Sequence, residues 1–425
     1  IYSAKQIEEK EVRLGFVARD GKDAREKLQV ALEELGQNSL VNWEKNGICY
    51  RMQGMHQGEK IVTLFSGQGG QYTQMFRETA MNYPELQEMF EIVDNAMLSE
   101  GEIPISDVVY PFSAYKEEEK VAENNLMQTK FTQPALAAVC GGVYKLLKQR
   151  GYTSDFAIGH SFGELTALWA NGVMSDETYA HLAVKRGYFM GQPIEDATGM
   201  MAVAAPRDEV EKYIEGFDKL YMANENSNQQ NIVSGDMVQL DLLAEALQAK
   251  NITAKKLRVS SAFHSPYMEK AKEAFKTEIH SAPFNDLQGT IIANATHGEY
   301  PKEATQIKAL LEEQITNPVY FRTCIEKAYA EGARIFVEIG PGKVLSGLLK
   351  HILGERPYEI ITVNADRKTG DLYQLEMACM KLKTIGLAIQ ADPYEMSVNP
   401  EIKLKATKSS YEVPPTFFRT PDKKK

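Results

Sequence analysis

The residues that most constrain the fold are Gly-His-Ser-Phe-Gly-Glu at positions 159–164. The run Phe156 to Gly159 is short and apolar, as in a buried strand, and a helical pattern follows Ser161. A serine between two glycines at such a strand-to-helix turn is typical of a nucleophile elbow, because a side chain at either glycine would crowd the tight turn. The alternative is an ordinary glycine-flanked helix start. The strand before it and the helix after it favour the elbow, and they predict a parallel α/β sheet.

A helix that begins at Ser161 has a chemical consequence. Free N–H groups and the helix dipole stabilise negative charge at this end, so the N–H of Phe162 is predicted to be an oxyanion-hole donor. A nucleophilic serine also needs a base, and the chain has seven histidines. We favour His264 among them. It ends a strand-like run from Val259 at the edge of a predicted insertion, where a cleft would form.

The chain is predicted to contain a main body with an insertion and two flanking segments. The expected units are a small α/β linker at 1–58, a large α/β unit at 59–196 and 262–366, an inserted α+β unit at 197–261, and a C-terminal linker at 367–425. In the large unit, a helix is expected to begin at Pro134 with Thr132 as its cap. The elements expected in the insertion are the strands Met200 to Ala205 and Asn231 to Ser234, and the helices Arg207 to Gly216 and Met237 to Lys250.

Composition narrows the class of protein. The chain has 425 residues, of which 43% are hydrophobic and 25% charged, as in ordinary globular domains. The net charge of -10 argues against a nucleic-acid binder. The four cysteines lack metal-ligand or redox spacing and predict reduced thiols in the cytoplasm. We expect no membrane span and no signal peptide, and the first residue, Ile1, suggests a piece of a longer polypeptide.

Three motifs in order carry a resemblance to a known family. They are GHSFGE at 159–164, FSGQGGQY at 65–72 and SAFHSPYM at 261–268. From Ile61 to Asp366 the chain resembles the acyltransferase domains of fatty-acid and polyketide synthases, the malonyl-CoA:acyl carrier protein transacylase family. The run 165–170 and the linker-like segment 12–51 are similar to type I iterative synthases that make polyunsaturated fatty acids or enediynes. The resemblance implies an α/β-hydrolase-like large subdomain with an inserted ferredoxin-like subdomain, flanked by linkers.

The resemblance also implies roles for individual residues. Ser161 would carry the acyl group, His264 would be its general base, and the backbone carbonyl of Gln314 would orient the histidine. Gln68 would supply the second oxyanion N–H beside Phe162. A phosphate loop or a plain turn is the alternative for the glycine cluster that contains Gln68. A Walker phosphate loop would need Lys-Ser/Thr after its last glycine, and this sequence has Gln-Tyr there.

The substrate class follows from Arg186 in the same resemblance. A guanidinium holds a carboxylate through two parallel hydrogen bonds, so Arg186 would select malonyl over acetyl groups. The bulky ring of Phe263 would leave no room for an α-methyl group. Malonyl-selecting polyketide domains commonly have His or Gly where Ser261 stands. Because serine is small and polar, an extender unit with a polar α-substituent is also compatible with this sequence. The remaining positions that match the family's pocket are Gln133, Met190 and Asn226.

The function implied by these residues is ping-pong transfer of a malonyl-type unit from CoA to the phosphopantetheine thiol of an acyl carrier protein. No metal or redox cofactor is implied, and a neighbouring ketosynthase is expected in the parent synthase. Neither a nucleic acid nor a membrane is an expected partner. Two alternatives remain. One is a serine thioesterase or editing hydrolase on the same elbow, with a carboxylate completing a triad. The other is a catalytically silent docking domain, against which Ser161, His264 and Arg186 together argue.

Overall fold

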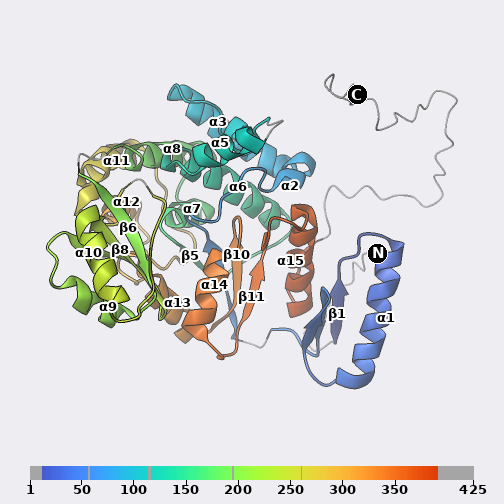
Figure 1. Cartoon of the computed structure of the whole chain (residues 1–425). Coiled ribbons are helices and arrows are strands. Elements are labelled where there is room, and N and C mark those ends of the chain that lie inside the picture. Colours follow the sequence, from blue (N-terminus) through green and yellow to red (C-terminus); the bar gives the residue numbers. More distant parts are fainter. Residues whose placement is uncertain (1–11, 56–57, 113–115, 194–195, 260, 391–425) are drawn as a thin grey trace, which may run out of the picture.

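The computed structural model describes residues 12–55, 58–112, 116–193, 196–259 and 261–390. Its elements form three units along the chain (Figure 1). The expectations for the first residues and for most of the C-terminal linker lie outside the described residues. Among the described helices, none combines the length and apolar character that a membrane crossing requires.

The N-terminal unit is a three-stranded antiparallel sheet with one helix. Its elements are β1 (Arg13–Phe16), α1 (Gly21–Asn38), β2 (Trp43–Lys45) and β3 (Ile48–Arg51), with the strand order β1-β3-β2. The short, half-polar β2 was not expected from the sequence. Helix α15 (Asp371–Ile385) packs against this sheet, as Figure 1 shows. The approach is close: a Cβ at Gly15 would lie 2.5 Å from Met380 Sδ.

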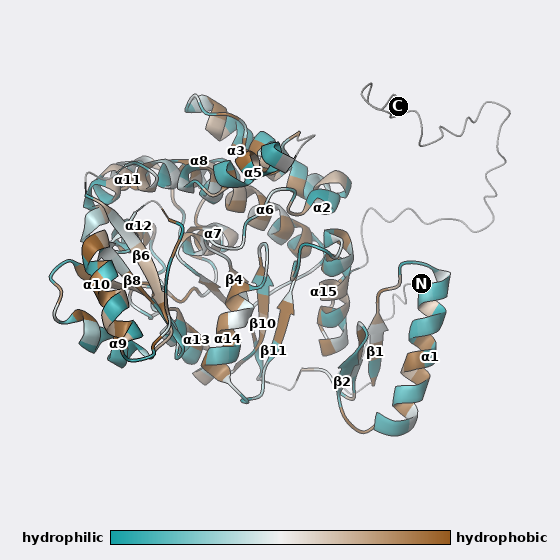
Figure 2. Ribbon diagram, in the orientation of Figure 1, coloured by the Kyte–Doolittle hydropathy of each residue, from teal (hydrophilic) through white to brown (hydrophobic). Residues whose placement is uncertain are grey.

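The large unit is built around a four-stranded parallel sheet. Its strands are β4 (Lys60–Phe65), β5 (Phe156–Gly159), β10 (Ala333–Ile339) and β11 (Glu359–Thr362), in the order β11-β10-β4-β5. Five consecutive residues of β4 are buried, as expected for a strand covered on both faces. Much of β10 and β11 is likewise coloured hydrophobic in Figure 2.

Helices cover both faces of this sheet (Figure 1). Besides α15, the helices of the large unit are α2 (Arg77–Asn82), α3 (Pro84–Ser99), α4 (Ile105–Val109), α5 (Lys116–Leu126), α6 (Thr129–Gln149), α7 (Phe162–Ala170), α8 (Asp176–Met190), α11 (Glu269–Ser281), α12 (Ala304–Glu312), α13 (Phe321–Ala330) and α14 (Val344–Leu353). One short 3₁₀ helix, Pro266–Met268, precedes α11, and another, Glu313–Ile315, follows α12.

The expected start of one helix was wrong. Helix α6 begins at Thr129, so Pro134 lies inside the helix rather than at its first position. Thr132 does not cap it either. The Thr132 hydroxyl donates backwards to the carbonyls of Leu126 and Gln128, at 2.6 and 3.1 Å, and its N–H bonds to Gln128 O at 2.8 Å. The helix therefore starts more than a turn earlier than the proline signal predicts.

The inserted unit contains four antiparallel strands, twice the expected number. Its elements are β6 (Thr198–Val203), α9 (Arg207–Ile214), β7 (Leu220–Ser227), β8 (Gln230–Asp236), α10 (Met237–Gln248) and β9 (Ala254–Lys256), with the strand order β7-β8-β6-β9. The pattern of apolar residues missed β7 because its second half, Asn-Glu-Asn-Ser at 224–227, is polar yet buried. Of these polar residues, Asn224 and Asn226 line a cavity, and Glu225 bonds to the large unit.

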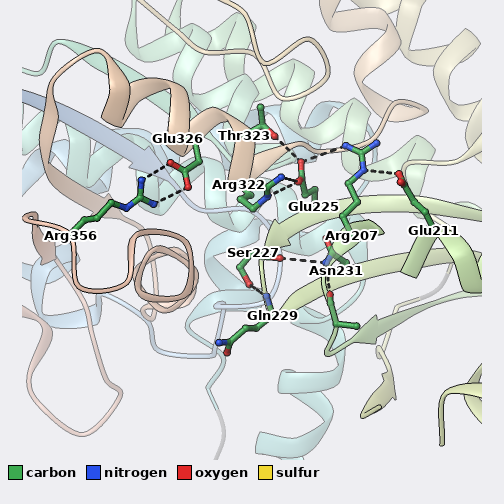
Figure 3. Close-up of polar contacts among 11 residues, drawn as sticks. Arg207, Glu211, Glu225, Ser227, Gln229, Asn231, Arg322, Thr323, Glu326 and Arg356 are labelled. Carbon is green, nitrogen blue, oxygen red and sulfur yellow. Dashed lines mark hydrogen bonds and ion pairs between the residues drawn. The ribbon is translucent and has the colours of Figure 1, made fainter. Parts of the chain in front are cut away.

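A buried ion-pair cluster joins the inserted unit to the large one (Figure 3). Glu225 in β7 is 1% exposed and accepts from Arg322 Nε at 2.6 Å and from the Thr323 hydroxyl at 2.9 Å, both in α13. Arg207 of α9 approaches the same carboxylate at 3.7 Å. The Glu225 N–H also donates to Val319 O at 2.9 Å. The cluster therefore fixes β7, which lines one wall of the candidate site.

Candidate active site

The turn between β5 and α7 is a strained nucleophile elbow. Ser161 has φ 52° and ψ -112°, a conformation that non-glycine residues rarely adopt. The two flanking glycines are required by space. A Cβ at Gly159 would lie 2.0 Å from Glu164 N, and one at Gly163 would lie 2.1 Å from Phe65 O in β4. The serine is thereby lifted from the sheet at the first turn of α7.

Asn294, which the sequence analysis did not single out, holds this elbow from outside. Its Oδ1 accepts from Ser161 N at 2.9 Å, and its Nδ2 donates to Gly159 O at 2.6 Å. Its own N–H donates to Glu164 Oε1 at 3.1 Å. One side chain thus bonds the backbone on both sides of the turn. No sequence signal marked Asn294, because it lies in an irregular segment after the short bridge at Ile292.

The structure brings Ser161 and His264 into contact. Ser161 Oγ lies 2.7 Å from His264 Nε2. On the other side of the ring, Nδ1 lies 3.2 Å from Gln314 O and 3.0 Å from Asn317 O. Both of these partners are carbonyls and can only accept, so Nδ1 carries the hydrogen and Nε2 is free to accept one. Within the described ranges no carboxylate is hydrogen-bonded to His264.

The environment keeps His264 neutral. Burial lowers the pKa of His264 to about 3, and the nearby Arg186 guanidinium and the His160 ring act in the same direction. His160 itself points to β7, where its Nε2 lies 2.8 Å from Asn226 Oδ1. The base therefore needs no deprotonation step at neutral pH before it accepts a proton from the serine.

The strand-like run expected before His264 was wrong. Strand β9 ends at Lys256, and residues 257–259 and 261–265 form no strand. The segment turns locally instead, because Phe263 N bonds to Ser261 O at 3.1 Å and the Ser265 hydroxyl donates to Ala262 O at 2.6 Å. His264 adopts φ 57° in this turn. Both members of the Ser-His pair thus occupy left-handed backbone positions.

Arg186 lies deep beside this pair, on α8. It is 0% exposed, and its Nη2 donates to Gln314 Oε1 at 2.8 Å. Among the described residues, no acceptor reaches its Nε or Nη1. Burial lowers the pKa of Arg186 to about 10, so it remains a cation at neutral pH. A buried guanidinium with two free donors in its fork fits a carboxylate ligand.

Gln314 connects the parts of the site. Its backbone carbonyl faces His264, as expected, and its side chain adds contacts that the sequence analysis missed. The side-chain Nε2 donates to Ser161 O at 2.6 Å and to Glu164 Oε2 at 3.1 Å, while Oε1 accepts from Arg186. In the sequence, Glu164 is marked only by its place in the GHSFGE motif.

The loop after β4 packs directly against the elbow. A Cβ at Gly67 would lie 2.4 Å from His160 O, and one at Gly70 would lie 2.1 Å from Pro341 O. Gln68 between them borders the Ser-His pair, and its side-chain Oε1 accepts from Gln133 Nε2 at 3.2 Å. Phe162 is the first residue of α7, where the N–H has no acceptor within the helix.

A cavity of 310 Å³ opens over the Ser-His pair, between the inserted unit and the large one. Of the residues proposed from the sequence, those that line it are Gln68, Ser161, Asn226, Phe263 and His264. The proposed residues that are buried and do not line it are Gln133, Phe162, Arg186, Met190, Ser261 and Gln314. Gln133 and Met190 are in contact there, with Gln133 Nε2 3.5 Å from Met190 Sδ. A larger hollow of 610 Å³ at α2 and the start of α15 contains none of these residues.

The chain is similar to known proteins in sequence. Residues 62–388 match the family described as acyl transferase domain. The chain is 33% identical over 393 residues to one component of the polyunsaturated fatty acid synthase of Thraustochytrium sp., covering 89% of this chain and 14% of that protein. It is 33% identical over 333 residues to malonyl CoA-acyl carrier protein transacylase of Bacillus subtilis, covering 76% and 98% of the two chains.

Among solved structures, the chain resembles the acyltransferase domain from the second module of the salinomycin polyketide synthase. The TM-score is 0.77 at 26% identity, over 93% of this chain and 88% of that one. The mixed fold, with one parallel and two antiparallel sheets, is therefore shared with a solved acyltransferase domain. The chain spans only about one seventh of the Thraustochytrium synthase component, but nearly all of the Bacillus protein.

Proposed function

Because the chain belongs to the acyl transferase family, as an acyltransferase of the malonyl-CoA:acyl carrier protein transacylase type, we propose that it transfers malonyl-type groups through an ester on Ser161. The observation that carries this proposal is the 2.7 Å contact between Ser161 Oγ and His264 Nε2 on a strained elbow. The other ring nitrogen of His264 is held by backbone carbonyls. The serine thus has an oriented, neutral base within hydrogen-bond reach.

In the loading step, Ser161 Oγ attacks the thioester carbonyl of malonyl-CoA, and His264 Nε2 takes the hydroxyl proton. The N–H groups of Phe162 and Gln68 hold the resulting oxyanion, each worth about 3–4 kcal/mol in serine enzymes. The C–S bond then breaks, and His264 returns the proton to the departing CoA sulfur. This leaves an O-malonyl ester on Ser161 and free CoA.

In the transfer step, the phosphopantetheine thiol of an acyl carrier protein attacks the ester on Ser161. His264 Nε2 takes the thiol proton and returns it to the departing Ser161 oxygen. The products are the malonyl thioester of the carrier protein and the starting enzyme. The chemistry uses no metal or redox cofactor, since CoA enters as the substrate thioester and phosphopantetheine as part of the partner.

Arg186 selects the cargo in this proposal. Its free Nε and Nη1 donors can grip the free carboxylate of a malonyl group through charge-assisted hydrogen bonds, each worth about 1.5–3 kcal/mol. An acetyl group would leave both donors buried and unpaired. Phe263 lines the cavity beside His264 and limits bulk at the α-carbon. Ser261 is buried, and its hydroxyl has no partner among the described residues, so the proposal includes extender units with a polar α-substituent.

The setting of this reaction is also a proposal. We place the domain in a type I iterative synthase beside a ketosynthase, on the strength of its likeness to a component of a polyunsaturated fatty acid synthase. The elbow after β5 of the parallel sheet supports an α/β-hydrolase-like description of the large unit. The order β6-α9-β7-β8-α10-β9 supports a ferredoxin-like description of the insertion.

The test is acyl loading followed by mass spectrometry. After incubation with isotope-labelled malonyl-CoA, we expect a stable malonyl mass on the peptide that contains Ser161, and no label in Ser161→Ala. Arg186→Ala should lose the preference for malonyl over acetyl while still accepting acetyl. Rapid release of free malonate would instead support a hydrolase, and no label at all would support a silent docking domain. Unaltered malonyl loading in Arg186→Ala would refute the account of selectivity.

A further inference from the structure

A buried carboxyl beside the site has no role in the mechanism above. Glu164 lies in the first turn of α7, three residues after Ser161, and is 1% exposed. Its Oε1 accepts from Asn294 N at 3.1 Å, and its Oε2 accepts from Gln314 Nε2 at 3.1 Å. Burying a carboxylate is costly unless a positive charge compensates it. The nearby positive charge is the guanidinium of Arg186.

The side chain of Gln314 connects Glu164 to Arg186. Its Oε1 accepts from Arg186 Nη2 at 2.8 Å, and its Nε2 points to Glu164. Arginine can only donate, so the amide cannot turn over without placing its NH₂ group against the guanidinium. Glu164, Gln314 and Arg186 therefore form a fixed carboxyl–amide–guanidinium chain. At the guanidinium end of this chain, two donors have no acceptor among the residues that the structure describes.

A second carboxylate on Arg186 would change the charge balance of this chain. Two carboxylates would then share one guanidinium in a buried site. Two carboxylates that share a buried site, away from water, do not both stay ionised. Burial already raises the pKa of Glu164 to about 7, although Tyr300, Asn294 N–H, Gln314 and Arg186 all favour its ionised form. Glu164 is thus the member of the pair that accepts a proton most readily.

The other titratable groups around Glu164 stay in one state near neutral pH. From the segment before α12, Tyr300 faces Glu164, and burial raises its pKa well above the usual range. From α13, Cys324 faces it, and burial raises that pKa as well. From α8, Arg186 remains a cation. His264, which faces Arg186, is neutral because its pKa is lowered to about 3.

We propose that Glu164 is the resident counter-charge of Arg186 and takes up a proton from solvent when the carboxylate of a malonyl-type group binds to Arg186. The inference rests on the proposed function, in which Arg186 grips that carboxylate. Glu164 acts through Gln314 and Arg186 and does not touch the acyl group, so it is a positioning residue that contributes to specificity. An acetyl group brings no charge and requires no proton.

The pH dependence follows directly. A proton is gained on binding, so malonyl binding is favoured at low pH and weakens as pH rises through the pKa of about 7. The expected loss approaches tenfold in affinity per pH unit above that value. Binding of acetyl-CoA does not depend on this proton. The ratio of the two affinities cancels ionisation of the CoA phosphates, which both ligands carry.

The proton can be counted by titration calorimetry of Ser161→Ala with malonyl-CoA, at about pH 7.5, in buffers of different ionisation enthalpy. We expect uptake of about half a proton or more per malonyl-CoA bound, and none with acetyl-CoA. Adding Glu164→Gln should abolish the uptake. Adding Glu338→Gln, which alters a buried carboxyl bonded to the N-terminus of α14 rather than to Arg186, should leave the uptake unchanged.

Two results would overturn the inference: malonyl-CoA binding without proton uptake, or uptake that persists in Glu164→Gln. If that variant does not fold, as judged by its melting curve, the pH profile of the malonyl-to-acetyl affinity ratio decides instead, and a flat ratio refutes the inference. Labelling of Ser161 in the unmodified protein separates the two proposals. Labelling without proton uptake rejects only the role of Glu164, whereas no labelling rejects the proposed function and the inference together.

Discussion

Replacing Asn294 by alanine tests whether the elbow depends on a residue that the motif does not contain. The substitution removes the acceptor of Ser161 N and the donor to Gly159 O. Two hydrogen bonds are worth about 2 kcal/mol net, and buried groups left unpaired add about 1–3 kcal/mol more. The backbone strain at Ser161, with φ 52°, is of order 1–3 kcal/mol. The hydrogen bonds lost are thus worth at least as much as the backbone strain at Ser161 that they offset.

We therefore expect the elbow of Asn294→Ala to relax from its strained geometry. A cost of about 3 kcal/mol in reaching the reactive conformation corresponds to roughly 10²-fold slower loading. Rapid-quench mass spectrometry of the malonyl ester on Ser161 measures this rate. The melting temperature should also fall by several degrees. Stability loss alone does not distinguish the elbow from any other buried site, so the rate is the informative quantity.

Asn231→Ala is the matched control. Asn231 is also a buried asparagine whose Nδ2 donates to two backbone carbonyls, of Ala205 at 2.7 Å and Ser227 at 3.4 Å, but it lies in the inserted sheet (Figure 3). It should lower the melting temperature to a similar extent and leave the loading rate within about twofold. Wild-type loading in Asn294→Ala, or equal slowing in both variants, would refute the reasoning.

Three further outcomes are expected. Loading from acetyl-CoA should be flat between about pH 5 and 8, because the lowered pKa of about 3 keeps His264 neutral; a fall between about pH 6.5 and 5.5 would contradict this. Gly163→Ala should abolish loading, since its Cβ would lie 2.1 Å from Phe65 O, and an active variant would show that the turn can shift. Glu225→Gln, which weakens the charge-assisted bonds of a buried carboxylate, should destabilise the protein by about 2–3 kcal/mol in a melting assay. Glu326→Gln, which breaks a half-exposed pair, should cost about 0–1 kcal/mol, and equal costs would refute the difference in burial.

The elements that the sequence predicted well depend on short-range patterns. Strands β5 and β6 and helix α10 follow from the apolar residues within their own spans. The misses have a common cause. Strand β7 is polar where it meets the large unit, and α6 starts before its proline because the Thr132 hydroxyl finds carbonyls of the preceding turn. In each case contacts outside the pattern outweighed local propensity.

By itself, the sequence determined the chemistry of the elbow. The six residues 159–164 impose much of it, since a side chain at Gly159 would clash with Glu164 N. Only the tertiary structure decided what surrounds the serine. Asn294 and Gln314 bond the backbone of Ser161 from 133 and 153 positions away, and the same Gln314 side chain joins Glu164 to Arg186. Such contacts leave no periodic trace, because hydrogen bonds between distant segments depend on where the packed elements meet rather than on their spacing in the chain.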